Sequence, residues 1–273
     1  MFTMFLAIGF AIIFSRPVKA TANGVQLKAN RTYTAYDVTD DGTKDKIRIR
    51  AANQTDDETY TSLTVSVNGK AAYRLKNTRF YNVIANIYTL KNGQPFLYLY
   101  APADNGDGPV CALLKYTNGK FRKALDFTEI MTGYGNHRIG EVTNLNGNKI
   151  VITESIVSYS LGINAINFTY KYVNGKFVPT SRYGSYKEIY SADGSSRYFT
   201  VNSNLPAYAR PGATAVNTTL KTGSLTKIIK CALINRKMYI QLECDGEIYW
   251  IKALENPPIS DSERQFMEVR YAG

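Results

Sequence analysis

The chain has 273 residues, of which 44% are hydrophobic, and this is enough to bury a substantial core in one or two domains. It carries 33 Lys or Arg against 22 Asp or Glu, a formal net charge of +11, and one His, which excludes sites that need several histidines. Residues 1–185 hold 22 basic and 13 acidic side chains, and residues 186–273 hold 11 and 9, so most of the excess lies in the first region. A basic surface there would attract polyanions, or would serve solubility alone.

The N-terminus predicts export. Residues 1–14 are apolar apart from Thr3 and Gly9, and a small-x-small pattern follows at Ala20-Thr21-Ala22. This run is shorter than the roughly 20 residues that a membrane-spanning helix needs. We therefore predict a signal peptide over 1–22, a secreted or cell-surface protein, and no membrane contact beyond that segment. No basic residue precedes the apolar run, which leaves an uncleaved anchor open.

The rest of the chain predicts an all-β fold, because it is rich in tyrosine and β-branched residues and lacks helical spacing of apolar positions. Asp-Gly and Asn-Gly pairs favour hairpin turns, since their residues adopt positive φ readily. Six of them fall into three sets, in which the two glycines are 27, 26 and 28 residues apart: Gly42 and Gly69, Gly93 and Gly119, Gly147 and Gly175.

This spacing predicts three repeats, near 29–77, 80–127 and 137–184, each with four strands in two hairpins. A repeat of about 40–50 residues with four strands is typical of a β-propeller blade. Three blades are fewer than a closed ring usually has. An incomplete propeller, a three-bladed arrangement and an array wrapped by the chain ends all remain open, as does a β-sandwich in which the turns recur by chance.

The first turn of the first repeat has the pattern of a calcium loop. Asp37, Thr39, Asp41 and Asp45 occupy loop positions one, three, five and nine, and Gly42 occupies position six. Position twelve is Arg48 instead of Glu and lies in an alternating strand pattern, so the loop joins two strands. The equivalent turns of the other repeats lack carboxylates, so a hairpin of this kind does not require them.

This stretch resembles the calcium loops of FG-GAP and VCBS-type propeller repeats, which occur in integrin-like and bacterial secreted proteins. The resemblance implies a calcium ion held by Asp37, Thr39, Asp41, the Thr43 carbonyl and Asp45. The alternative is a solvated turn without an ion.

Residues 186–196 lose the repeat and are interpreted as a linker. The segment 197–273 has short strands at close spacing and resembles the bacterial Src-homology-3-like domain. The matching residues are Leu205, Tyr208, Pro211, Gly212, Leu220, Lys221, Gly223, Tyr239, Trp250 and Ile251. The resemblance implies a small five-stranded barrel with a C-terminal tail, often a cell-wall or peptide-binding module.

Aromatic residues of this segment are the candidate ligand-binding residues. Tyr208, Tyr239, Tyr249 and Trp250 would form a platform for stacking sugars or peptides, or would simply form the core of a small barrel. Tyr249 stands where the family usually has Gly before Trp.

Catalytic motifs are absent from the sequence. It has no nucleophile elbow, no zinc-binding helix motif and no phosphate-binding loop. Two interpretations of Cys111 are open: a catalytic thiol dyad with His137, or a position in the apolar core. Three cysteines permit one bridge, Cys231 with Cys244, or three buried thiols. We predict that the protein is not an enzyme.

The predicted organisation is a signal peptide over 1–22, a propeller-like repeat domain with the calcium loop over 23–185, a linker over 186–196, and the barrel with its tail over 197–273. The predicted function is a non-catalytic, calcium-stabilised binding module for bacterial cell-wall glycan or peptide or another extracellular ligand. Polyanions are possible partners of the basic repeat domain, and nucleic acid is not expected. Two alternatives remain: a glycan-active hydrolase, with two carboxylates about 5–10 Å apart in a cleft, and a structural accessory domain without a ligand.

Overall fold

The structure, a computed structural model, describes residues 24–55, 58–104 and 108–271. Antiparallel strands dominate this part of the chain, accompanied by short 3₁₀ helices at Phe127–Glu129 and Asp261–Glu263. The described strands form several sheets, and none of them closes on itself. The predicted all-β class is therefore confirmed. The predicted signal peptide lies outside the described residues, and no helix within them is long and apolar enough to cross a membrane.

The first sheet is a four-stranded meander. Its strands are β2 (Thr32–Tyr36), β3 (Asp45–Gln54), β4 (Tyr60–Val67) and β5 (Lys70–Phe80), in that order. Successive residues of a strand point to opposite faces. Along β3, isoleucines therefore lie on a buried face and lysine and arginine on an exposed one.

The second sheet has the order β1-β6-β7-β8-β9. These strands span Val25–Leu27, Ile84–Thr89, Pro95–Ala101, Val110–Thr117 and Lys120–Asp126. Every residue of β7 is buried, because a layer of apolar side chains covers each face of this sheet.

The third sheet is the largest, with the order β10-β11-β12-β14-β19-β20-β21. These strands span Gly135–Asn146, Lys149–Ser158, Gly162–Val173, Tyr183–Ser191, Leu225–Ile234, Lys237–Cys244 and Glu247–Lys252. Three short strands pair beside this path: β13 (Lys176–Pro179) with β12, β15 (Gly194–Ser195) with β14, and β16 (Tyr198–Thr200) with β19.

Each of the six predicted turns joins two paired antiparallel strands. Asn68, Asn118 and Asn174 have φ values of 51°, 50° and 49°, and the glycine after each also has positive φ. This is the turn geometry that Asn-Gly favours in two-residue hairpins. The chain consequently forms three successive antiparallel meanders, β2–β5, β6–β9 and β10–β13.

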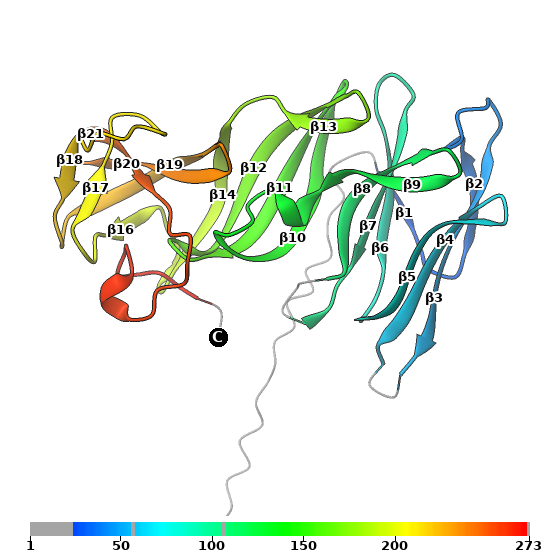
Figure 1. The fold of residues 1–273 in the computed structure, drawn as a ribbon, viewed down its shortest axis with the longest axis horizontal. Helices are drawn as coiled ribbons and strands as arrows, with labels where there is room; N and C mark the ends of the chain where they lie inside the picture. The colour runs from blue at the N-terminus through cyan, green and yellow to red at the C-terminus, as the bar shows by residue number, and fades with distance from the viewer. Residues whose placement is uncertain (1–23, 56–57, 105–107, 272–273) are drawn as a thin grey trace, which may run out of the picture.

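The three sheets stack face to face, with the second sheet in the middle (Figure 1). Leu97 of β7 packs in an apolar layer with Ile49 of the first sheet. Its neighbour Tyr98 points the other way, into a layer with Ile152 of the third sheet. The outer face of the first sheet and the outer face of the third sheet therefore lie on opposite sides of the stack.

The described residues do not form the predicted closed barrel. β17 (Leu205–Ala207) pairs with β18 (Thr218–Leu220) in a separate two-stranded sheet. β19, β20 and β21 instead continue the third sheet, because β14 pairs with β19. Residues 186–191 of the predicted linker belong to β14, in which buried side chains alternate with more exposed ones.

The three cysteines are free, buried thiols. Cys231 pairs with Ile240 in the β19–β20 ladder, whereas Cys244 pairs with Thr226. The two cysteines are thus four residues apart along the ladder, roughly 13 Å, which is beyond the reach of a disulfide. The bridge that the sequence left open is not formed.

Candidate functional site

The outer face of the third sheet carries a row of polar side chains that crosses five strands. Asn167 of β12 pairs with Ser185 of β14, and Ser185 pairs with Lys230 of β19. Lys230 pairs with Gln241 of β20, and Gln241 with Trp250 of β21. Directly opposed residues of neighbouring strands point to the same face of a sheet. The row therefore presents amide, hydroxyl and ammonium groups side by side and ends on an indole ring.

A groove of about 310 Å³ lies in this face. Its lining residues are Val151, Asn167, Thr169, Thr180, Ser181, Tyr183, Gly184, Ser185 and Lys230. Most of them offer hydroxyl or amide groups, and none is a carboxylate. Asn167 Oδ1 accepts a hydrogen bond of 2.7 Å from Thr153 Oγ1, which fixes the orientation of the amide.

Positive charge is held against aromatic rings at one end of the groove. Lys230 Nζ lies 4.6 Å from the ring centroid of Tyr183 and 6.0 Å from that of Trp250. The guanidinium of Arg182 lies 5.2 Å from the Tyr183 ring, and Lys252 Nζ lies 5.1 Å from the Tyr208 ring. These distances are within the roughly 6 Å over which a ring attracts a cation. The rings thus orient the cations above the sheet.

Three of the four predicted platform residues come together, but they are buried. Tyr208, Tyr239 and Trp250 are 6%, 5% and 4% exposed and form an apolar cluster with Ala232. The backbones of Tyr208 and Trp250 exchange hydrogen bonds of 2.7 and 2.9 Å. Tyr249 packs against the main core instead, because neighbouring residues of a strand face opposite sides. Tyr183 packs against this cluster on the same face of the sheet, and the Lys230 ammonium lies 6.0 Å from the Trp250 ring.

The predicted calcium loop is held together by its carboxylates. Asp45 is 1% exposed, and its Oδ2 accepts hydrogen bonds from the amides of Val38 (2.7 Å) and Thr39 (2.9 Å). The Asn68 side chain donates to Asp45 Oδ1, and this contact ties the loop to the next hairpin turn. Asp45 therefore stabilises the loop by accepting these hydrogen bonds.

Asp37 closes the same loop from the other side. Its carboxylate accepts from the amides of Asp40 (2.7 Å), Asp41 (3.3 Å) and Gly42 (2.7 Å). Although partial desolvation raises the pKa of Asp37, the hydrogen bonds led by that from Gly42 leave it below its ordinary value. The carboxylate form is therefore the one that the loop stabilises.

The side chains at loop positions one, three and nine converge. Thr39 Oγ1 lies 3.3 Å from Asp37 Oδ1 and 3.1 Å from Asp45 Oδ2. Asp41 Oδ1 accepts a hydrogen bond from the Thr43 amide at 2.8 Å. Among the described residues, no group of three or more acidic, His or Cys side chains is arranged to hold a metal ion. The side-chain oxygens of Asp37, Thr39 and Asp45 are of the kind that calcium prefers.

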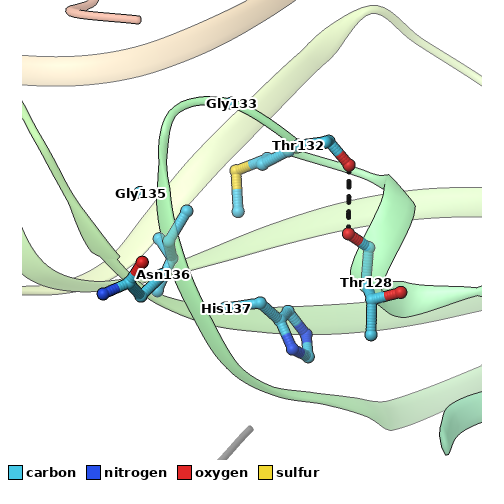
Figure 2. Close-up of a pocket in the computed structure, with 8 residues that line it drawn as sticks. Thr128, Thr132, Gly133, Gly135, Asn136 and His137 are labelled. Atoms are coloured by element: carbon cyan, nitrogen blue, oxygen red, sulfur yellow. Dashed lines mark hydrogen bonds between the residues drawn. The ribbon is translucent and has the colours of Figure 1, made fainter. Parts of the chain in front are cut away.

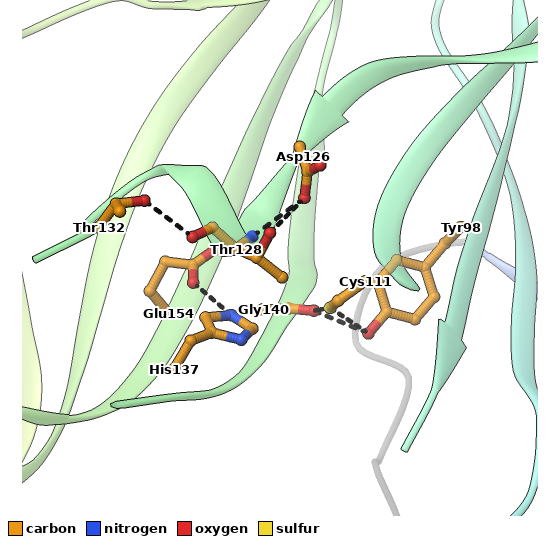
Figure 3. Close-up of polar contacts among 8 residues, drawn as sticks. All are labelled: Tyr98, Cys111, Asp126, Thr128, Thr132, His137, Gly140 and Glu154. Atoms are coloured by element: carbon orange, nitrogen blue, oxygen red, sulfur yellow. Dashed lines mark hydrogen bonds and ion pairs between the residues drawn. The ribbon is translucent and has the colours of Figure 1, made fainter. Parts of the chain in front are cut away.

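A buried glutamate and a partly buried histidine lie between the second and third sheets (Figure 3). Glu154 of β11 is fully buried, and its Oε2 lies 2.9 Å from His137 Nε2 of β10. Burial raises the pKa of Glu154 well above its ordinary value, and the charge of Asp126 acts in the same direction. Gly140 makes room for this carboxyl group, since a Cβ there would lie 2.4 Å from Glu154 Oε1 and 2.2 Å from the Phe127 ring.

Cys111 lies near this pair but is not activated. Its thiol donates to the carbonyl of Gly140 at 3.3 Å, and the Tyr98 hydroxyl donates to the same carbonyl at 2.7 Å. Burial raises the pKa of the Cys111 thiol to about 12. The thiol is therefore protonated at neutral pH, which argues against the Cys111–His137 dyad.

A cavity of about 220 Å³ opens beside His137 (Figure 2). Its lining residues are Thr128, Met131, Thr132, Gly133, Gly135, Asn136, His137 and Ile156. Thr132 Oγ1 donates to the Thr128 carbonyl at 3.1 Å, and Thr128 Oγ1 donates to Asp126 Oδ1 at 2.8 Å. Both hydroxyls thus act as donors to the protein's own oxygens, and no carboxylate lines the cavity.

No protein-family model, curated protein or solved structure matches this chain. The resemblances to propeller repeats and to the Src-homology-3-like domain accordingly remain predictions.

Three residues of the groove were not predicted as site residues: Lys230, Tyr183 and Asn167. They are far apart in the sequence and meet only through the pairing of β12, β14 and β19. The local signal was the alternation along β14, where Tyr183 and Ser185 leave the core side of the sheet. This alternation indicates that the two side chains are exposed, but it does not indicate which residues of other strands lie beside them.

Proposed function

We propose that this chain is a non-catalytic binding module that recognises an acidic glycan through the outer face of the third sheet. The observation that carries the proposal is the placement of Lys230 Nζ 4.6 Å from the Tyr183 ring at the end of a groove lined by hydroxyl and amide side chains. The groove volume of about 310 Å³ lies at the lower end of the range for small-ligand sites, about 300–1,000 Å³.

Each component of the groove has a counterpart in such a ligand. Asn167 and Ser185 can exchange hydrogen bonds with sugar hydroxyls, because amides and hydroxyls both donate and accept. Lys230 supplies a charge-assisted bond to a carboxylate on the sugar. Tyr183 offers an apolar ring with a polar tip, which suits the face of a sugar. Tyr208, Tyr239 and Trp250 serve this site by packing beside Tyr183 and by offering rings to Lys230 and Lys252.

An acidic wall glycan is extracellular, so the proposal includes export through the predicted signal peptide and a secreted or cell-surface location. It also includes a calcium ion at the first hairpin, held by Asp37, Thr39 and Asp45, whose oxygens converge. Such an ion would add a central positive charge to a loop that amide donors already hold closed. Its role would be stability and not ligand recognition.

Calorimetric titration of the full chain with a hexuronic-acid oligosaccharide, and with a neutral oligosaccharide of equal length, tests this function. We expect binding of the acidic ligand alone. Lys230→Gln and Tyr183→Ala should each weaken it at least tenfold. Lys227→Gln is the matched control, since Lys227 lies on the same strand with its Nζ 5.9 Å from the Tyr198 ring, outside the groove. This variant should bind like the original chain.

The remaining alternatives predict different results. A structural accessory domain would bind neither oligosaccharide. A glycan-active hydrolase would shorten the ligand during the titration, which size analysis of the recovered oligosaccharide would detect. Equal losses for Lys230→Gln and Lys227→Gln would mean that only overall charge matters and would contradict the proposed groove.

A further inference from the structure

The outer face of the first sheet is strongly basic. It exposes Lys46, Arg48 and Arg50 on β3 and Arg74 and Lys76 on β5. Strands β2, β4 and β5 contain no acidic residue. Within the described part of the chain, none of these five side chains forms an ion pair with a carboxylate. We call this surface the basic face.

The acidic residue of β3 points away from the basic face. Asp45 is the one acidic residue of β3, and it points to the buried side, where the loop amides occupy it. The other face of the sheet is covered by the apolar layer shared with the second sheet. Five positive charges on one small, rigid surface repel one another, so the surface favours a multivalent anion.

The strand pairing sets the spacing of these charges. Alternate residues such as Arg48 and Arg50 are about 6.8 Å apart along a strand. Arg50 and Arg74 both pair with Thr64, so they lie two strand spacings apart, roughly 9.6 Å. Thr64 lies between Arg50 and Arg74, and its hydroxyl offers an additional donor.

We propose that the basic face binds an extended phosphodiester polymer without bases, of the polyol phosphate type. A repeat of six backbone bonds extends to about 7 Å, two units of about 3.5 Å, which matches the charge spacing along β3. Arg48, Arg50 and Arg74 can each bind a phosphate with two parallel hydrogen bonds.

Other polyanions fit this face less well. Single-stranded nucleic acid is usually bound with aromatic side chains on which its bases stack. Here Tyr33, Tyr60 and Tyr73 pack against the buried apolar layer instead. An anionic membrane surface favours apolar side chains that insert among the lipids. The exposed large hydrophobic residues of the described chain all lie outside β2–β5.

The basic face is independent of the proposed glycan groove, because the second sheet separates the two surfaces (Figure 1). The test is binding of the full chain to fluorescently labelled poly(glycerol phosphate), followed by anisotropy. With five phosphate contacts, raising the salt from 50 to 200 mM should weaken binding by about 100-fold. The triple variant Arg48→Gln/Arg50→Gln/Arg74→Gln should lose at least tenfold in affinity at low salt, and its salt dependence should fall below about tenfold.

A charge-matched control distinguishes binding that depends on the basic face from binding that depends on net charge alone. Lys120→Gln/Lys176→Gln/Lys221→Gln removes three exposed lysines outside the first sheet, at the starts of β9 and β13 and directly after β18, and should stay within threefold of the original chain. If the glutamine variant fails to fold, Arg48→Lys/Arg50→Lys/Arg74→Lys replaces it. This variant keeps the charge and should show an intermediate loss, because lysine cannot form the paired hydrogen bonds.

Three results would overturn the inference. The first is no binding of poly(glycerol phosphate) at low salt. The second is an equal loss in the glutamine triple variant and in the charge-matched control. The third is tighter binding of single-stranded DNA, or of phosphatidylglycerol vesicles, than of poly(glycerol phosphate) at equal phosphate concentration. The Lys230→Gln variant should bind poly(glycerol phosphate) within threefold of the original chain.

Discussion

His137 Nε2 lies 2.9 Å from Oε2 of Glu154, a carboxyl group that is fully buried between two sheets. An acid with a raised pKa in the folded state keeps a proton that the unfolded chain has released. The free energy of unfolding therefore falls as pH rises above the unfolded-state pKa of Glu, about 4.3, and continues to fall up to the folded-state pKa.

Glu154→Gln removes this pH dependence, because the amide cannot ionise. We expect the stability of the original chain to fall relative to this variant as pH rises above the unfolded-state pKa. Urea unfolding at a series of pH values from about 5 to 8 measures the difference. Glu129→Gln is the control, since Glu129 is exposed, and its stability should depend on pH in the same way as that of the original chain. Parallel profiles for Glu154→Gln as well would contradict the assignment.

Gly140→Ala should destabilise the fold. The added methyl would lie 2.2 Å from the Phe127 ring and 2.4 Å from Glu154 Oε1, so the layer between the sheets must shift. Overpacking of this kind costs about 1–3 kcal/mol, measured as a shift of the urea midpoint. Gly93→Asn is the comparison, since Gly93 has no neighbouring atom within 4 Å of its Cβ position and Asn tolerates positive φ. If Gly140→Ala lowered the urea midpoint no more than Gly93→Asn does, the layer between the sheets would accommodate the added methyl group at little cost.

Asp45→Ala should destabilise the first sheet whether or not calcium is present. The substitution leaves the amides of Val38 and Thr39 without their acceptor in a buried position. Each unsatisfied buried donor costs about 1–3 kcal/mol, so a loss of at least about 2 kcal/mol is expected. Thermal unfolding in the presence of a chelator measures it. An unchanged midpoint would mean that the loop opens to water at little cost.

Calcium itself is tested by the difference between melting temperatures with calcium and with chelator. If an ion binds, it stabilises the folded chain in proportion to its affinity, and the original chain melts higher with calcium. Asp37→Asn halves the negative charge that faces Thr39 and should abolish this increase. Asp104→Asn, an acid of a different loop, should retain it. No increase for the original chain, at millimolar calcium, would mean that the loop is a turn without an ion.

Local turn chemistry could be predicted well from the sequence. Asn118-Gly119 and its counterparts specify a hairpin from two adjacent residues, because few residues accept positive φ. The alternation of Ile47, Arg48 and Ile49 likewise determines which side of β3 is buried. Turn spacing and alternation together predicted the four-stranded meanders in chain order.

The pairing of distant strands was decided by the tertiary structure alone. β14 joins β12 to β19, and this merges the predicted repeat domain with the predicted barrel into one sheet. The sequence of β14 shows that it alternates but not which strand edges it meets, because backbone hydrogen bonds form equally well with many partners. For the same reason, Lys230 reaches Tyr183, 47 positions earlier in the chain, through a ladder that no local pattern encodes. Composition and turns thus determined an antiparallel β protein with an excess of basic residues, whereas long-range packing decided which charged and aromatic side chains share a surface.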